Sequence, residues 1–272
     1  MKEKWYRLTN RNRWIPVAAT FVLLVLLWIP NIVLGFEDGE MTFFFITWCF
    51  ILLCSFFVGS ANGSQLMNHR VLYMHNFCDP YPLVQECDDQ LSYVKNKGNR
   101  QMLTINRAAA LIALDYNADA LASLEALNID EPYCLPMWRY CYYNNIASAA
   151  LACGEREKAL VYRQKADQTA ATITKKKEKD IVQRSTYDWL TELCLQDGDY
   201  AGAAHHLSYQ TAAENPYQSV HRAFSIARIE MGCGNLANAR LQLEFVMQYG
   251  NRLAMVAKAA ALLAQMDGQE EK

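Results

Sequence analysis

Two long uncharged runs near the N-terminus constrain the fold of this chain most strongly. Residues 14–35 read WIPVAATFVLLVLLWIPNIVLG, and residues 41–60 read MTFFFITWCFILLCSFFVGS. As helices rising 1.5 Å per residue, both are long enough to cross the bilayer core of about 30 Å. A signal peptide is the alternative for the first run, but its apolar region is normally only about 7–15 residues long. The pair therefore predicts a transmembrane hairpin over residues 14–60.

The charges beside the two runs predict an orientation. Residues 1–13 carry five basic side chains, whereas the loop 36–40 carries none. Because Lys and Arg beside a span favour the cytoplasmic side, we expect a basic cytoplasmic N-terminus and, after two spans, a cytoplasmic C-terminus. The nine cysteines are scattered, without a C-x-x-C pair, which fits a reducing compartment. The lipid bilayer is then a partner of this multi-pass protein.

Small residues mark one face of the second run. Ser55, Gly59 and Gly63 recur every four residues and so share one side of a helix. Such spacing lets membrane helices approach closely, which predicts a packing seam in the membrane and allows homo- or hetero-oligomers through the spans. A loosened helix end at residues 59–64 is the alternative. Residues 61–77 are expected to form a juxtamembrane connector.

The remaining residues, 78–272, have the pattern of a helical domain. Apolar residues recur at helical spacing, and no segment alternates as a strand does. This part has 20 basic and 24 acidic side chains, a net charge of about −4. Nucleic-acid binders usually carry a clustered basic face, so the balance argues against a nucleic-acid partner.

An internal repeat organises this domain. Three glycines are each followed, five residues later, by an alanine. The glycines are Gly154, Gly198 and Gly234, and the alanines are Ala159, Ala203 and Ala239. Asp115 and Ala120 form a weaker fourth copy. The pattern predicts helical hairpins, in which the glycine makes the turn and the alanine lies where the two helices cross.

Gly198-Asp199-Tyr200 followed by Ala203 resembles the tetratricopeptide-repeat (TPR) family, and the resemblance covers roughly residues 99–250. The family period is 34 residues, shorter than the spacings here, which are 39, 44 and 36. The resemblance implies an all-α fold: a TPR-like α-solenoid with a concave groove that binds protein. An irregular helical array outside this family is the alternative. We expect an opening helix at 80–96, pairs at 100–127, 135–171, 178–211 and 217–249, and a closing helix at 251–266.

Aligning the repeats on their alanines predicts which side chains face the groove. These candidate partner-binding residues are Asn144, Ser148, Asp188, Glu192, His221 and Arg228. An ordinary hydrated surface is the alternative interpretation. The sequence contains no phosphate-binding glycine loop, no G-x-S-x-G and no H-E-x-x-H. We therefore expect no enzyme activity, no cofactor and no metal site.

These observations together predict a function. The leading hypothesis is a membrane-anchored cytoplasmic scaffold or adaptor that binds a protein partner through the groove. The alternative is an accessory subunit of a larger membrane complex, with the transmembrane hairpin as its main contact. An enzyme would need an acid–base constellation that the sequence lacks.

Overall fold

The computed structural model describes residue 12 and residues 14–34, 40–127, 129, 134–210 and 212–270. Side chains are described within these ranges except at 27–34, 40–44, 55–63 and 269–270. Within these ranges every assigned element of secondary structure is an α-helix, so the all-α prediction holds for the part described. The chain divides into two compact units, Met1–Arg70 and Val71–Lys272.

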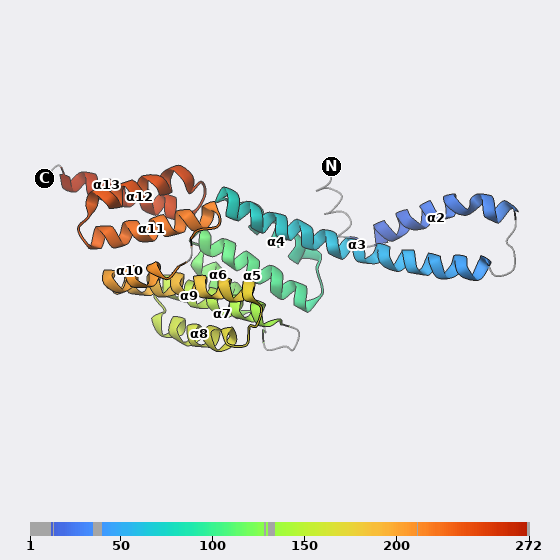
Figure 1. Ribbon diagram of the computed structural model, residues 1–272, viewed down its shortest axis with the longest axis horizontal. Coiled ribbons are helices and arrows are strands. Elements are labelled where there is room, and N and C mark those ends of the chain that lie inside the picture. Colours follow the sequence, from blue (N-terminus) through green and yellow to red (C-terminus); the bar gives the residue numbers. More distant parts are fainter. Residues whose placement is uncertain are drawn as a thin grey trace. The chain divides into compact units, whose positions relative to one another are not determined.

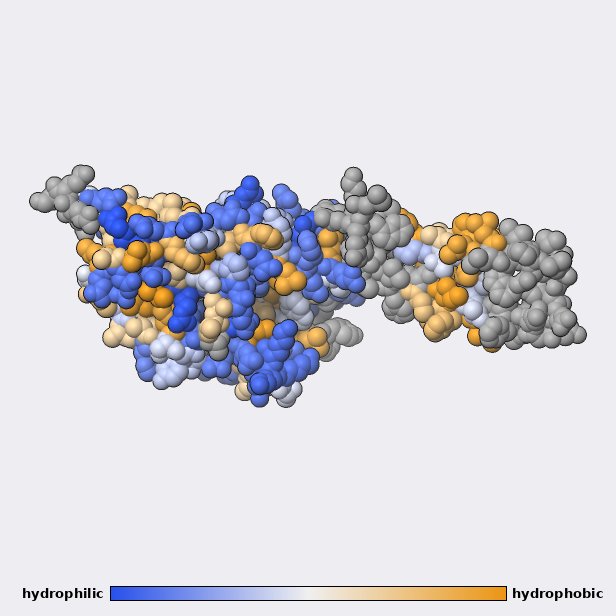
Figure 2. All heavy atoms as spheres, turned by 45° about the horizontal axis from the view of Figure 1, so that its top comes forward, coloured by the Kyte–Doolittle hydropathy of each residue, from blue (hydrophilic) through white to orange (hydrophobic). Residues whose placement is uncertain are grey.

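The first unit contains helix α2 (Trp14–Leu34) and most of α3 (Glu40–Phe77). Phe21 of α2 and Trp48 of α3 lie edge to face, with their ring centroids 4.8 Å apart. Many described apolar side chains of these helices are exposed, and they appear in orange in Figure 2. α3 continues past residue 70 and ends inside the second unit.

The predicted transmembrane hairpin is wrong. Over the residues described, no helix has both the length and the apolar character that crossing a membrane requires. The second predicted span was expected to stop at residue 60. Instead α3 runs to Phe77 and takes in Gln65, Asn68, His69 and Arg70, so the apolar run is only part of a longer helix of mixed polarity.

The membrane location was inferred from the hairpin, so it is not supported either. An integral membrane protein with spans at 14–35 and 41–60 and both termini in the cytoplasm is not supported. The basic segment 1–13 lies outside the described residues except for residue 12. The expected connector 61–77 is helical, because it forms the last turns of α3.

The second unit is an array of helix pairs, shown in Figure 1. It opens with the end of α3 and with α4 (Tyr81–Tyr93). The pairs that follow are α5 (Lys97–Ala113) with α6 (Asn117–Glu125), α7 (Pro136–Ala152) with α8 (Arg156–Ala170), α9 (Lys176–Gln196) with α10 (Tyr200–Ser208), and α11 (Pro216–Gly232) with α12 (Leu236–Tyr249). The closing helix α13 spans Ala254–Glu270. These bounds agree closely with the predicted pairs and closing helix.

The first helices of successive pairs form one layer. α5 contacts α7, α7 contacts α9, α9 contacts α11, and α11 contacts α13. Each first helix also packs on the second helix of its own pair. Neighbour-to-neighbour stacking of this kind is how helical solenoids build a continuous core.

The turn inside each pair has the same backbone geometry. Asp115, Gly154, Gly198 and Gly234 have φ between +67° and +81°, the left-handed region that glycine enters without a Cβ clash. In each turn the following residue donates its N–H to a carbonyl five residues earlier, for example Glu155 to Ala150 at 2.8 Å. This is the Schellman helix end, so the predicted turns are confirmed in all four pairs.

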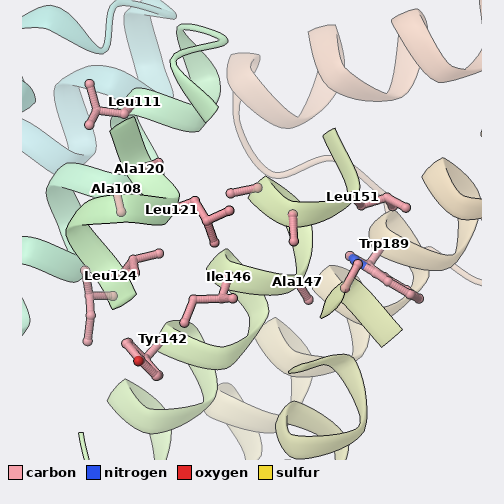
Figure 3. Close-up of a cluster of buried hydrophobic side chains, with 14 of the residues drawn as sticks. Ala108, Leu111, Ala120, Leu121, Leu124, Tyr142, Ile146, Ala147, Leu151 and Trp189 are labelled. Atoms are coloured by element: carbon pink, nitrogen blue, oxygen red, sulfur yellow. The ribbon is translucent and has the colours of Figure 1, made fainter. Parts of the chain in front are cut away.

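The four aligned alanines are fully buried, as the helix-crossing interpretation predicted: Ala120, Ala159, Ala203 and Ala239. The core around the first two runs through several pairs. Figure 3 shows Leu124 of α6, Ile146 of α7 and Trp189 of α9 within this cluster. Consecutive pairs therefore share one apolar core.

Candidate functional site

A cavity of about 1040 Å³ lies within the second unit. Its walls come mainly from the layer of first helices, α5, α7, α9 and α11, and from α13. This volume lies at the upper end of the roughly 300–1,000 Å³ of ordinary ligand pockets. The cavity therefore has the position and the size of a binding groove.

The structure brings all six predicted groove residues to this cavity. Asn144 and Ser148 are on α7, Asp188 and Glu192 on α9, and His221 and Arg228 on α11. The register taken from the buried alanines thus places these residues on one surface. Their part in binding a partner stays a prediction.

The charged members of this set pair with one another. Arg228 Nη1 lies 2.5 Å from Glu192 Oε2, and its guanidinium carbon lies 5.8 Å from the ring centroid of Phe224. The ion pair links α11 to α9, and each charge is already matched by the other. This differs from the sequence expectation, in which Glu192 and Arg228 are available to bind a partner.

Asp188 is engaged in a similar way. Its Oδ1 accepts a hydrogen bond from Gln210 Nε2 at 2.7 Å and lies 3.8 Å from His221 Nδ1. Burial raises the pKa of the Asp188 carboxyl, an effect that His221 opposes. Beside it, burial raises the pKa of Tyr217 to about 12. Both shifts reflect a part of the wall that water solvates poorly.

Asn144 is held by a residue that the sequence analysis did not single out. Arg163 of α8, only 5% exposed, donates from Nη1 to Asn144 Oδ1 at 2.9 Å and from Nη2 to Thr186 Oγ1 at 2.9 Å. Its guanidinium carbon also lies 5.7 Å from the Trp189 ring centroid. Arg163 therefore joins three helices behind the cavity wall. A lone Arg in a helix gives no sequence signal for such a role.

The sequence analysis also missed the wall that α13 supplies. Met255, Lys258, Leu262 and Met266 line the cavity. Their spacing of three or four residues puts them on one helix face. The apolar periodicity of residues 251–266 is the sequence signal for this face of the closing helix.

Two buried polar atoms at the cavity have no hydrogen-bond partner among the described residues. They are the indole Nε1 of Trp189, a side chain 4% exposed, and the Oδ1 of Asn117. Both residues line the cavity. Buried donors and acceptors are nearly always satisfied, so these two atoms mark an incompletely hydrogen-bonded part of the cavity wall.

The structure gives no basis for a metal centre within the described residues, where no cluster of three or more His, Cys, Asp or Glu side chains occurs. All nine cysteines are free thiols. Ser55, Gly59 and Gly63 lie on α3, but their side chains are outside the described residues. Their packing seam, which was predicted for a membrane, therefore has no contacts to describe.

Comparison with known proteins adds no relative. No family model matches the chain, and neither a curated protein nor a solved structure matches it. The tetratricopeptide resemblance accordingly stays a prediction, and function has to be argued from the cavity itself.

Proposed function

We propose that this protein is a helical-repeat scaffold that binds a segment of a protein partner in the cavity of its second unit. The observation that carries the proposal is the lining of the cavity by four successive first helices and by α13. A segment lying there touches several repeats at once. Solenoids commonly bind extended partners on such concave surfaces without reactive side chains. A groove of this architecture supports binding and implies no chemical reaction.

The size of the cavity supports a peptide as occupant. A helix about 10 Å in diameter, rising 1.5 Å per residue, fills about 120 Å³ per residue. The volume of about 1040 Å³ therefore has room for roughly nine residues in a helix.

The chemistry of the walls indicates what such a peptide contains. Asp188, Glu192 and Arg228 already pair within the protein, so charge matching is not the main attraction. Apolar side chains such as Ile112, Met255 and Leu262 offer contact area.

Tetratricopeptide family membership, which implies a groove of the same kind, is part of this proposal. The accessory-subunit hypothesis is not retained, because its main contact was the transmembrane hairpin.

Selection of peptides tests the proposal without a known partner. A random peptide library is selected on the full chain, and the affinities of the enriched peptides are measured for the wild type and two variants. Ser148→Trp fills the cavity, whereas Glu157→Trp adds the same side chain at an exposed position of α8 outside the cavity lining. We expect Ser148→Trp to weaken binding by about tenfold or more and Glu157→Trp to leave it unchanged. Enriched peptides that bind Ser148→Trp as well as the wild type would contradict the cavity as binding site.

A further inference from the structure

The two ends of the repeat unit are joined to each other. The turn between α12 and α13 meets the junction between α3 and α4. Asn251 Nδ2 donates to the carbonyl of Phe77 at 2.8 Å, and the Arg252 N–H donates to the carbonyl of Cys78 at 3.2 Å. Arg252 Nη1 also lies 3.7 Å from Asp79 Oδ2. Asn251 and Phe77 are 174 positions apart, so the array closes on itself.

Both sides of this junction have an unusual backbone. Cys78 has φ +52° and Asn251 has φ +48°, although neither is glycine. Asn enters this region fairly readily, whereas for Cys it is uncommon, so Cys78 in particular is held there by its surroundings. The mutual contacts of the two turns supply part of that restraint.

A second contact fixes α13 across the cavity. Lys258 Nζ of α13 lies 2.7 Å from Oδ1 of Asp115, the left-handed turn residue between α5 and α6. Asn117 Nδ2 donates to the same oxygen at 2.8 Å and so orients the carboxylate. α13 thereby connects the last helix pair to the first. Asp115 and Lys258 both line the cavity, so this connection lies beside it.

The two attachments of α13 differ in strength. On the side of the last pair, Ala259 and Met266 are buried, and the Arg240–Asp267 ion pair, with side chains 30% and 60% exposed, adds little to this packing. On the side of the first pair, the Lys258 and Asp115 side chains are 50% and 44% exposed. An exposed ion pair contributes little to stability and is screened by salt. α13 therefore separates most easily from the first pair, at the Lys258–Asp115 contact.

We propose that these contacts form a clasp, consisting of the Lys258–Asp115 ion pair and the contacts of Asn251 and Arg252 with Phe77, Cys78 and Asp79. The clasp holds α13 across the cavity and limits entry of the partner segment; its release widens the entrance. This inference rests on the proposed function, since it concerns regulation of the same cavity. The closed form competes with binding, so weakening the clasp raises apparent affinity.

Hydrogen–deuterium exchange tests the clasp without any ligand. Lys258→Gln and Asp115→Asn each remove the ion pair, and Asn still tolerates the left-handed turn. In the full chain, each variant should speed amide exchange across α13 by about two- to fivefold, and the double variant should add nothing further. Lys158→Gln is the control, because it removes the exposed ion pairs of Lys158 with Glu125, at 2.9 Å, and with Glu155, outside the cavity lining. It should leave the exchange of α13 unchanged.

Salt gives an independent check. Raising the ionic strength should speed exchange of α13 more in the wild type than in Lys258→Gln, which, among the ion pairs described for α13, keeps only the Arg240–Asp267 pair. Exchange of α13 that is the same in the wild type, both single variants and all salt concentrations would overturn the clasp.

A binding measurement separates the clasp from the proposed function. For peptides selected on the cavity, Lys258→Gln should lower Kd by about two- to fivefold relative to Lys158→Gln. If these peptides bind with equal Kd to both variants and exchange is also unchanged, the clasp is wrong and the cavity remains the binding site. If exchange responds as expected but no selected peptide depends on the cavity, the proposed function fails while the closure of the array stands.

Discussion

At the scale of single residues, Arg163 shows how a polar side chain organises the wall behind the candidate site. Its guanidinium is buried and donates to Asn144 and Thr186, while Nε donates to Asp167 at 3.0 Å. A buried cation is tolerated only with such partners, since an unpaired charge in the interior is strongly unfavourable. The planar fork of arginine donates from three separate nitrogens in a fixed geometry, whereas lysine donates from a single nitrogen.

Replacing Arg163 therefore has a predictable effect on stability. Arg163→Lys keeps the charge but cannot serve Asn144 and Thr186 together, so we expect a loss of about 2–3 kcal/mol of unfolding free energy. Arg156→Lys is the matched control, because Arg156 pairs with Asp197 at 2.5 Å on an exposed surface. It should lose clearly less, because an exposed ion pair is screened by water and contributes little. Urea unfolding followed by circular dichroism measures the unfolding free energy of both variants. Equal losses would show that the buried network stabilises the fold no more than the exposed ion pair does.

At the scale of elements, glycines serve two different purposes. Gly198 ends α9 at φ +71°, and a Cβ added there meets nothing within 4 Å. Gly232 ends α11 at an ordinary φ, but an added Cβ would lie 2.2 Å from the ring of Tyr200. The first glycine is needed for backbone conformation and the second for space between α11 and α10.

The two roles predict different patterns of substitution. Gly198→Ala should cost about 1–2 kcal/mol from left-handed strain, and Gly198→Asn less, because Asn visits that region more readily. Gly232→Ala should cost about 1–3 kcal/mol by overpacking against Tyr200. A smaller side chain at position 200 should relieve Gly232→Ala but not Gly198→Ala. Thermal melts of the single and double variants measure this, and relief of both by Tyr200→Leu would contradict the separate roles.

The same scale shows what the sequence could predict. Helix pairs and turns were predictable because they depend on local signals: 3.6-residue periodicity, and glycine followed by alanine. The groove register followed from those alanines. The pairing of Glu192 with Arg228 was not predictable, because it depends on how α9 and α11 meet. The transmembrane hairpin was wrong because an apolar window does not give the bounds of a helix, as α3 shows.

At the scale of the whole molecule, the second unit begins inside α3. The sequence placed the start of the helical-repeat domain at residue 78. However, Met74 is buried, and the His75 ring stacks on Tyr217 of α11 with centroids 5.6 Å apart. The carbonyl of Phe77 also accepts from Asn251. The last turns of α3 therefore belong to the repeat unit in structural terms.

Two truncations test this boundary. We expect residues 71–272 to fold into a helical protein, because this range holds a complete compact unit. Residues 78–272 should be less stable by about 2 kcal/mol or more, since a buried methionine alone is worth about 1.5–3 kcal/mol. Urea unfolding of both fragments measures the difference. Identical midpoints with identical slopes would place the boundary at residue 78 after all.

Joining the ends of the array also changes how it folds. An open solenoid behaves as a one-dimensional chain whose terminal repeats fray and whose folding spreads between neighbours. Contacts between Phe77 and Asn251 span 174 positions. They add a large loop-closure entropy that local helix pairing avoids. Closure should therefore come late, after the pairs have formed, and should couple the first and last repeats so that neither unravels alone.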